Sequence, residues 1–570
     1  MIPTGSKEGL LVLLAPAIVL PLLLFAYPLA LDIPALDPAE GLHASIAQEM
    51  IERGDWVTPR FLGKPFFDKP ILYFTAEAVS MRLFGMHEAA LRLPGLLFGL
   101  LGAVTAGLLG WRMFGRNTGV LATLFYATMI LPTTLAQAAA HDVALIPFVN
   151  LAILGFWESD RATSRRRAWG CTLATGVALG LACLSKGLVG IAVVGVAYGY
   201  YLLAARRLTL AACLRGAAAL AIAMLIASPW YLAVEARHPG FLYYFFVARH
   251  VLGYTTDTQP HANRPFWYYL PILLAGGMPW ILYLPTTLHD AWLRRRSADP
   301  RCRSGLLLLV CWAAGGTLFL SVAHSKSVTY IWPVFPSLAI LAAVSWRRFW
   351  DGSLDQSAYQ ALGRTLRNLS WTLPLLPPLI VIAVHFACGL DISWQAWTAV
   401  LAAAALATLP LWFWKAGHAG RALSTAIVAV AVQFAVLMTV VVPGVSISYS
   451  ARDLARHFNA AGRLPPRVLL TEERVGSIVF YLDRKLRAEL RPGQLEDFQL
   501  ARLEELPTAE PGTVVAVPER WVEPMARCID LRGIAFQQAG HYRVYEAQRL
   551  APAVLKPAAR GYASARRVAR

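Results

Sequence analysis

The chain has 570 residues, of which 57% are hydrophobic and 15% charged, and its mean hydropathy is +0.50. A soluble globular protein does not sustain this composition, so the sequence predicts a polytopic membrane protein. The net charge of +18 would indicate nucleic-acid binding only if the basic residues gathered on one soluble face, and they are scattered instead.

About thirteen apolar stretches are long enough to cross a bilayer. The first has no small-residue cleavage site behind it and is too long for the apolar core of a signal peptide, so we expect a retained span. The predicted spans are residues 10–31, 94–112, 118–137, 142–158, 169–185, 187–205, 216–234, 267–286, 305–323, 329–346, 369–388, 395–414 and 423–443. This pattern predicts an all-α membrane protein.

Basic residues fall in every second short connection between these spans. Arg165–Arg167, Arg206 with Arg207, and Arg347 with Arg348 are examples. Connections rich in Lys and Arg are cytoplasmic. The long polar loop 32–92 therefore lies outside, and an odd number of spans sends the C-terminus outside as well.

Two short helices are predicted in the loop 32–92. Apolar residues recur at helical spacing between positions 39 and 53, and Gly54 follows the last turn. A second helix is expected after Pro70, with Lys69 just before its first residue. We expect both to lie on the membrane surface.

The composition changes after Val445 to polar sequence with short apolar runs, separated by Pro and Gly turns. These runs are Arg467–Leu470, Ser477–Leu482, Thr513–Val517 and Tyr542–Tyr545. We expect three regions: a membrane domain over residues 1–445, a small α/β domain over 446–550 outside the membrane, and a basic disordered tail over 551–570.

Motifs in a fixed order carry a resemblance to a known family. They are Glu40–Met50, Gly54–Pro59, Phe67–Pro70, His141–Asp142, Leu184–Gly187, Tyr244–Phe246, Pro265–Pro271, Met278–Trp280, Ser325–Lys326 and Thr329–Pro333. In this combination the sequence resembles the bacterial GT-C glycosyltransferases that use polyprenyl-phosphate sugars. It is similar to the aminoarabinose transferases of lipid A and to the wider protein O-mannosyltransferase-like superfamily.

The resemblance implies a GT-C fold and an inverting glycosyltransferase in the bacterial inner membrane, with its active site and C-terminal domain facing the periplasm. It implies an undecaprenyl-type phosphate sugar as donor and an envelope glycolipid, with lipid A as the candidate, as acceptor. We expect a monomer surrounded by membrane lipids. No cofactor is certain, and a divalent metal ion is left open.

The chain departs from this family in its first loop. The family carries an Asp-Glu pair there, whereas this chain has Ala39 in place of the Asp and retains Glu40. Asp37, two residues upstream, is a candidate replacement for the missing carboxylate. Leu42 and His43 stand where aminoarabinose transferases carry Arg and Tyr, so the sugar is left open.

Cationic side chains are expected at the outward ends of several spans or in outward loops. An anionic phosphodiester at headgroup depth needs such groups, and cations from different helices can meet at one phosphate. Each of them could instead be an anchor that reaches toward lipid phosphates. The candidates are Lys69, Lys186, Arg249, Arg264 and Lys326, with Tyr330 as a hydrogen-bond donor or a member of the aromatic belt.

The acidic and histidine candidates have alternatives as well. Glu40 or Asp37 could take the proton from a hydroxyl acceptor, and Asp142 could bind sugar hydroxyls or cap a helix. Asp55 and His43 are candidate substrate ligands in the same loop. A metal site could include His43 beside Glu40, and the loop residues His250 and His261 could complete it.

Two alternative functions remain open. A transporter or flippase would show repeated halves and ionisable or broken sites near the bilayer midplane, whereas the charged residues here gather at one surface. A protein O-glycosyltransferase of related fold would need a carboxylate base at Glu40 or Asp37.

Overall fold

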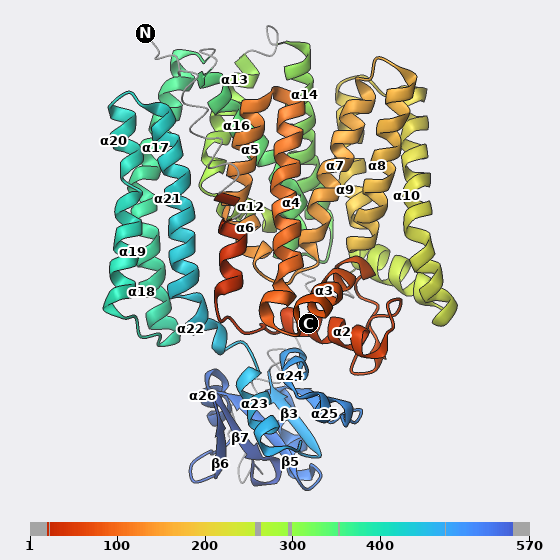
Figure 1. Cartoon of the computed structure of the whole chain (residues 1–570), viewed down its shortest axis with the longest axis vertical. Helices are drawn as coiled ribbons and strands as arrows, with labels where there is room; N and C mark the ends of the chain where they lie inside the picture. Colours follow the sequence, from red (N-terminus) through yellow and green to blue (C-terminus); the bar gives the residue numbers. More distant parts are fainter. Residues whose placement is uncertain are drawn as a thin grey trace.

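The computed structural model describes residues 20–550 except 22, 257–263, 294–298, 351–353 and 473–474. Long helices run side by side in a bundle, two shorter helices lie across one end, and a small domain with a sheet lies beyond them (Figure 1). The predicted class, a polytopic α-helical protein with a small C-terminal α/β domain, is confirmed.

Nine helical segments of the described chain are long and apolar enough to cross a membrane. They are α4 (Glu88–Phe114), α7 (Asp142–Asp160), α8 (Arg165–Lys186), α10 (Leu210–Arg237), α14 with α15 (Pro300–Val310, Gly316–Val322), α16 (Phe335–Trp350) with the turn before it, α17 with α18 (Gln356–Thr372, Leu376–Cys388), α19 with α20 (Trp394–Leu406, Leu409–Lys415) and α21 (Ala419–Val440). Each overlaps a predicted span, and the segment Gln356–Cys388 begins well before the predicted start at residue 369.

Three other predicted spans take a different form. The helix α9 (Leu188–Ala204) is shorter, and residues 116–137 and 266–289 are bent pairs with angles of 60° and 99°. The pairs comprise α5 (Arg116–Thr128) with α6 (Ile130–Ala136), and α12 (Tyr269–Gly276) with the start of α13 (Leu284–Leu293). The first predicted span, 10–31, lies mostly outside the described residues.

The two bends meet inside the bundle. The Ile130 amide, at the first bend, donates a hydrogen bond to the Met278 carbonyl at the second, at 3.2 Å. A backbone group freed by a bend must find a partner inside the protein, because lipid offers none. The Trp280 indole also donates to the Thr128 hydroxyl at 2.7 Å, so the second bend is fixed against the first.

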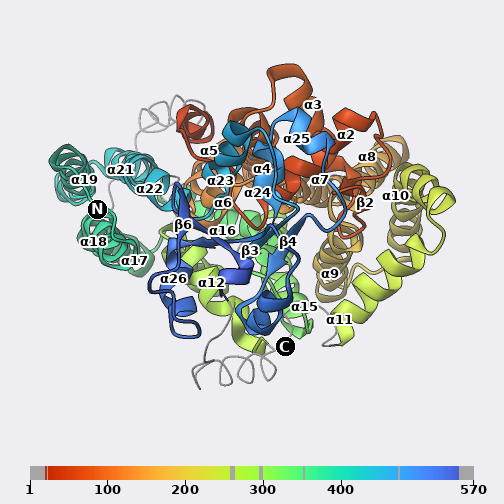
Figure 2. The same cartoon turned by 90° about the horizontal axis from the view of Figure 1, so that it is seen from below.

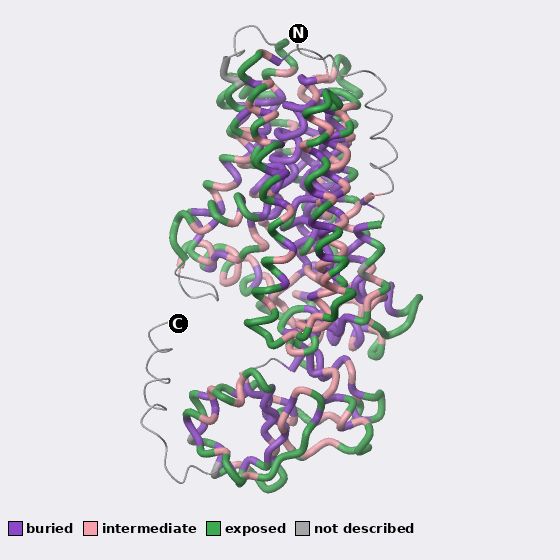
Figure 3. Tube along the Cα trace, turned by 90° about the vertical axis from the view of Figure 1, so that its left-hand side faces the viewer, coloured by how far each residue is buried: buried purple, intermediate pink, exposed green. Residues whose placement is uncertain are grey.

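Small residues let neighbouring helices of the bundle approach closely. A Cβ added at Gly176 or Gly180 of α8 would lie 2.6 Å or 2.7 Å from the Cβ of Ile222 or Ile226 on α10. Such spacing of small residues brings helices together where the surrounding lipid gives little hydrophobic driving force. Figure 3 shows buried residues concentrated along the middle of the bundle.

The two predicted helices of the first loop are confirmed. The first is α2 (Glu40–Arg53), which ends at Gly54 with a left-handed φ of 66°, and the second is α3 (Ile71–Phe84), which begins after Pro70. A two-stranded hairpin of β1 (Arg60–Phe61) and β2 (Lys64–Pro65) lies between them. Nine of the fourteen residues of α2 are buried, so this helix is enclosed by protein and is not a free surface helix.

The C-terminal domain contains a five-stranded sheet in the order β4-β3-β5-β7-β6. Its first three strands are parallel, and β7 and β6 are antiparallel to their neighbours. The strands are β3 (Arg467–Thr471), β4 (Leu495–Phe498), β5 (Thr513–Pro518), β6 (Phe536–Ala539) and β7 (Tyr542–Glu546), with helices α23 (Arg452–Ala461), α24 (Gly476–Tyr481), α25 (Arg484–Ala488) and α26 (Glu519–Ala526). Figure 2 views this domain from below, against the end of the bundle.

The C-terminal domain is docked on the first loop through α24 and α2. Asp37 Oδ1 accepts a hydrogen bond from the Ser477 amide at 2.9 Å, and the Ser477 hydroxyl donates to Asp37 Oδ2. Ser45 donates to the Gly476 carbonyl at 2.8 Å. Gly41 lies so close that an added Cβ would be 2.6 Å from Ser477 Cα.

The substitution Gly41→Ala is therefore expected to weaken this docking, because one of two backbones must move to admit the methyl group. Overpacking of this kind costs about 1–3 kcal/mol. Thermal unfolding in detergent, followed by intrinsic fluorescence, is expected to show a lower melting temperature. Gly195→Ala is the control, since a Cβ there meets no atom within 4 Å. Equal melting of the two variants would contradict the account.

Candidate active site at the α2–α3 end of the bundle

A buried ion pair joins the start of α2 to α4. Arg92 Nε and Nη2 donate to the two oxygens of Glu40 at 2.9 Å and 2.7 Å, and the amides of Leu36 and Ala139 donate to the same carboxylate. Burial raises the pKa of Glu40, but the charge and hydrogen bonds of Arg92 and the two amides outweigh it and hold the pKa below its ordinary value. Glu40 is thus a structural anion with both oxygens engaged.

Glu40 and His43 hold the same residue of a distant segment. Glu40 Oε1 accepts from the Ala139 amide at 3.0 Å, and His43 Nδ1 lies 2.7 Å from the Ala139 carbonyl oxygen. Because the carbonyl accepts, Nδ1 carries the proton and the neutral ring has its lone pair on Nε2. One turn of α2 therefore fixes the chain just before α7, where His141 and Asp142 stand.

Asp142 and Lys186 form an ion pair at the ends of α7 and α8. The ammonium of Lys186 also lies over the ring of Tyr330, 4.2 Å from its centroid. The ring of His141 lies beside those of His43 and Phe74, at 4.5 Å and 4.3 Å. The structure thus brings together five predicted site residues from separate elements: Glu40, His43, Asp142, Lys186 and Tyr330.

Lys69 lies among these groups, half-buried, directly before α3. Burial, aided by the positive charge of Lys69, lowers the pKa of His43 to about 4 and that of His141 well below its ordinary value. Burial and Lys69 act in the same direction on His250. Across the described residues, no ion pair or hydrogen bond to the Lys69 ammonium is formed.

The neighbouring carboxylate, Asp68, is occupied by residues of the π-helical turn Tyr243–Leu252. It accepts a hydrogen bond from the Tyr244 hydroxyl at 2.6 Å and pairs with Arg249 at 3.1 Å. Arg249 is thereby held against Asp68, the residue that precedes Lys69 in the sequence. Lys326 is buried, and its ammonium donates a hydrogen bond to the backbone carbonyl of Arg264 at 3.2 Å. This bond joins two of the predicted cationic residues.

Two predicted site residues have other surroundings. Asp37 contacts α24 of the C-terminal domain, as described above. Asp55 accepts hydrogen bonds from the amides of Val57 and Thr58 and pairs with Arg237 at 2.8 Å. These bonds hold the pKa of Asp55 below its ordinary value against the effect of burial. Asp55 therefore fixes a turn against the end of α10.

The predicted metal candidates are not assembled. Within residues 20–550, apart from the gaps stated above, no group of three His, Cys, Asp or Glu side chains could hold a metal ion. His250 Nδ1 is engaged by the Phe245 carbonyl at 2.6 Å, and His43 and Glu40 both bind Ala139. His261 lies outside the described residues.

Sequence reasoning missed Arg92 and Glu77. Arg92 is the partner of Glu40, and Glu77 on α3 is fully buried with its Oε1 3.9 Å from His43 Nδ1. Burial, together with the charge of Glu40, raises the pKa of Glu77 well above its ordinary value and favours its neutral form. The available signal was an acidic residue inside an otherwise apolar helix.

Comparison with known sequences supports the predicted resemblance. Residues 42–245 match the family model for dolichyl-phosphate-mannose-protein mannosyltransferase. The chain is 35% identical over 319 residues to the undecaprenyl phosphate-alpha-4-amino-4-deoxy-L-arabinose arabinosyl transferase of Erwinia tasmaniensis, covering 56% of each chain. It is 32% identical over 361 residues to that of Pectobacterium carotovorum, covering 62% of this chain. The chain spans 56% and 61% of the lengths of these two relatives.

Comparison with solved structures shows the fold. The crystal structure of ArnT from Cupriavidus metallidurans bound to undecaprenyl phosphate superposes with a TM-score of 0.72, at 22% identity, over 95% of this chain and 98% of that one. Its apo state gives a TM-score of 0.70 at 21% identity, over 95% and 99%. The predicted GT-C fold is confirmed.

Because His43 is buried in its neutral form, the stability of the protein is expected to depend on pH. Its folded pKa, about 4, lies below the ordinary 6.5, so the unfolded chain binds a proton first as the pH falls. The contribution of His43 to the free energy of unfolding is fully present above pH 6.5. It is lost as the pH falls from 6.5 to about 4, by up to about 3 kcal/mol.

His43→Asn removes the titration and keeps a donor for the Ala139 carbonyl, so its melting temperature is expected to fall less over this pH range. His418→Asn, which removes an exposed histidine, is the control and is expected to follow the wild type. An unchanged slope in His43→Asn would disprove the assignment.

Proposed function

We propose that this chain, which has the fold of the ArnT crystal structures, transfers a sugar from a polyprenyl phosphate carrier to a phosphate group of an envelope glycolipid. The observation that carries the proposal is the meeting of Lys69 and the Asp142–Lys186–Tyr330 group where the bundle faces α2 and α3. The names of the sequence relatives support an undecaprenyl phosphate donor.

The lysines suit the leaving group of this reaction. When the bond between the anomeric carbon and the carrier phosphate breaks, negative charge returns to that phosphate, and fixed cations stabilise it. Lys69 is the strongest candidate, because its ammonium has no protein carboxylate to neutralise it within the described chain. Lys186 is shared with Asp142 and held over Tyr330, which keeps it oriented.

The carboxylates favour an acceptor that is already ionised. Glu40 is engaged by Arg92, Asp37 by Ser477, Asp68 by Arg249 and Tyr244, and Asp142 by Lys186. A hydroxyl acceptor needs a base with a free lone pair, whereas a phosphate oxygen attacks without losing a proton. The bond from the acceptor phosphate oxygen to the anomeric carbon then forms on the face opposite the departing phosphate, with inversion.

We propose a phosphate of lipid A as the acceptor, because the sequence resembles the aminoarabinose transferases of lipid A and the candidate site is expected to face outward. The orientation rests on the arginine-rich connections, which lie at the end of the bundle remote from α2 and α3. The α2–α3 end and the C-terminal domain then face the periplasm of the bacterial inner membrane. The donor sugar stays open, since Leu42 and His43 replace the Arg and Tyr of the aminoarabinose enzymes.

Lys69→Ala is expected to reduce transfer by at least about 10²-fold, because the departing phosphate loses its unneutralised cation. The measurement is mass spectrometry of lipid A and total envelope glycolipids from a deletion strain complemented with wild type, Lys69→Ala or Lys64→Ala. Lys64 is an exposed lysine on β2 and is the matched control. The wild type and the control should restore one sugar mass that Lys69→Ala does not.

Undiminished transfer by Lys69→Ala would refute the phosphate assignment. Unchanged glycans in all strains, with altered accumulation of a carrier lipid, would refute the transferase function in favour of a transporter or flippase.

The double variant Asp37→Asn, Glu40→Gln tests the acceptor. Loss of a general base costs about 10²–10⁴-fold, so retention of transfer within about tenfold is expected if the acceptor is a phosphate. The assay uses purified enzyme that elutes as a folded protein, and a lower melting temperature is expected because Glu40→Gln breaks the buried pair with Arg92. Loss of transfer would favour a hydroxyl acceptor and a protein O-glycosyltransferase where Arg92→Gln, which breaks the same pair but keeps the carboxylate, retains transfer.

A further inference from the structure

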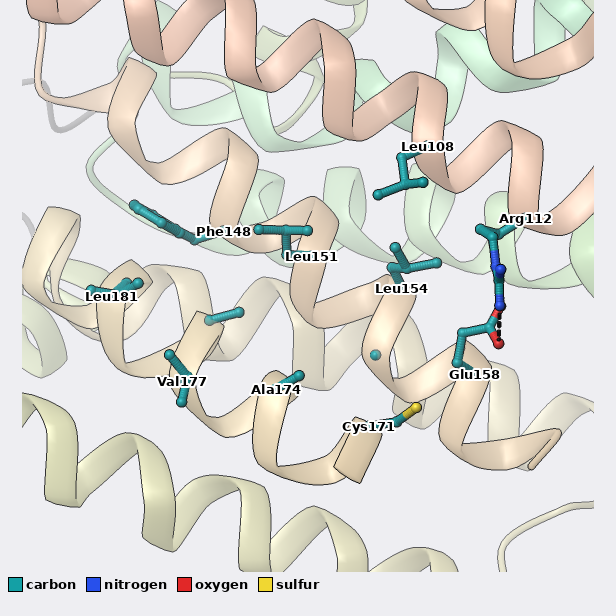
Figure 4. A pocket seen from close by; sticks show the side chains of 12 residues that line it. Leu108, Arg112, Phe148, Leu151, Leu154, Glu158, Cys171, Ala174, Val177 and Leu181 are labelled. Atoms are coloured by element: carbon teal, nitrogen blue, oxygen red, sulfur yellow. Dashed lines mark hydrogen bonds and ion pairs between the residues drawn. The ribbon is translucent and has the colours of Figure 1, made fainter. Parts of the chain in front are cut away.

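A lateral groove of about 580 Å³ lies in the half of the bundle away from the candidate active site. The helix α7 forms its floor, and α4 and α8 form its sides (Figure 4). Its walls are almost entirely apolar, with Leu108, Phe148, Leu154, Val177 and Leu181 among the lining side chains. At Gly155 the helix α7 packs closely on α8, since an added Cβ there would overlap Thr175 Oγ1.

The groove has the length of one lipid chain in one leaflet. Its lining on α7 runs from Phe148 to Glu158, and the rise from one to the other corresponds to about 15 Å along a helix. Half of the roughly 30 Å hydrocarbon core of a bilayer is the same distance. The lining on α8, from Leu181 to Cys171, has the same extent and runs in the opposite direction.

The groove ends at a cluster of arginines. Arg112 donates two hydrogen bonds to Glu158, at 2.9 Å and 2.8 Å, and Arg167 donates to the same carboxylate at 2.9 Å. Arg301 reaches the cluster through a hydrogen bond to the Arg112 carbonyl at 2.7 Å. Two guanidinium groups thus meet one carboxylate, with a third arginine beside them, and Arg112 and Arg167 are each about half exposed.

We propose that this groove binds an anionic phospholipid of the leaflet opposite the candidate active site. One acyl chain lies between α4 and α8, and the headgroup phosphate lies against Arg112 and Arg167. The apolar length fixes the depth of the lipid, because its phosphate reaches the arginines only when the chain fills the groove. The surplus of positive charge favours a headgroup with a net negative charge over a zwitterionic one.

The proposal is tested by native mass spectrometry of the purified full-length protein with dioleoylphosphatidylglycerol and dioleoylphosphatidylcholine as probes. The wild type is expected to bind the phosphatidylglycerol about tenfold more tightly than the phosphatidylcholine. Ala174→Trp places a large side chain in the groove from an exposed position and is expected to lower that affinity about tenfold. Arg167→Gln is expected to reduce the preference between the two lipids without filling the groove.

Leu97→Trp is the matched control, since Leu97 is an exposed residue of α4 outside the groove. It is expected to bind both lipids like the wild type. Only variants whose melting temperature equals that of the wild type are compared. Equal binding of the two lipids by the wild type, or wild-type binding by both Ala174→Trp and Arg167→Gln, would overturn the proposal. Displacement of the phosphatidylglycerol by decaprenyl phosphate at a concentration below that of the phosphatidylglycerol would also overturn it. The groove would then be a site for the polyprenyl phosphate carrier.

Discussion

The ion pair between Glu40 and Arg92 is the interaction on which the arrangement of the candidate site depends. Removing two charges from water is costly, and the cost is offset here because four hydrogen bonds from Arg92, Leu36 and Ala139 engage the carboxylate. The pair joins α2, which lies across the end of the bundle, to α4, which crosses it. Through Ala139 it also sets the position of His141 and Asp142.

The bundle supplies a complementary constraint from inside the membrane. The bends at residues 129–130 and 277–279 satisfy each other through the hydrogen bond from Ile130 to Met278, so neither helix pair needs water there. The segment after the first bend leads directly to Ala139. The charged groups of the candidate site are therefore held by a bent helix on one side and a buried ion pair on the other.

The helices could be predicted from the sequence, whereas their side-chain partners could not. A bilayer demands about twenty apolar residues per span, and Gly54 and Pro70 mark where the loop helices end and begin, so local sequence sufficed. Arg92 lies 52 residues after Glu40, and Asp68 is met by Arg249 across 181 residues. Spacing indicates which residues share a helix face, but it carries no information on which distant residue meets it.

The docking of α24 on α2 joins residues that are about 440 positions apart. Chains are synthesised from the N-terminus, so α2 and Asp37 leave the ribosome long before Ser477 exists. Contacts of such large sequence separation form late, since the intervening chain must first be organised. The first loop would consequently emerge first and reach its final form last, when the C-terminal domain closes against it.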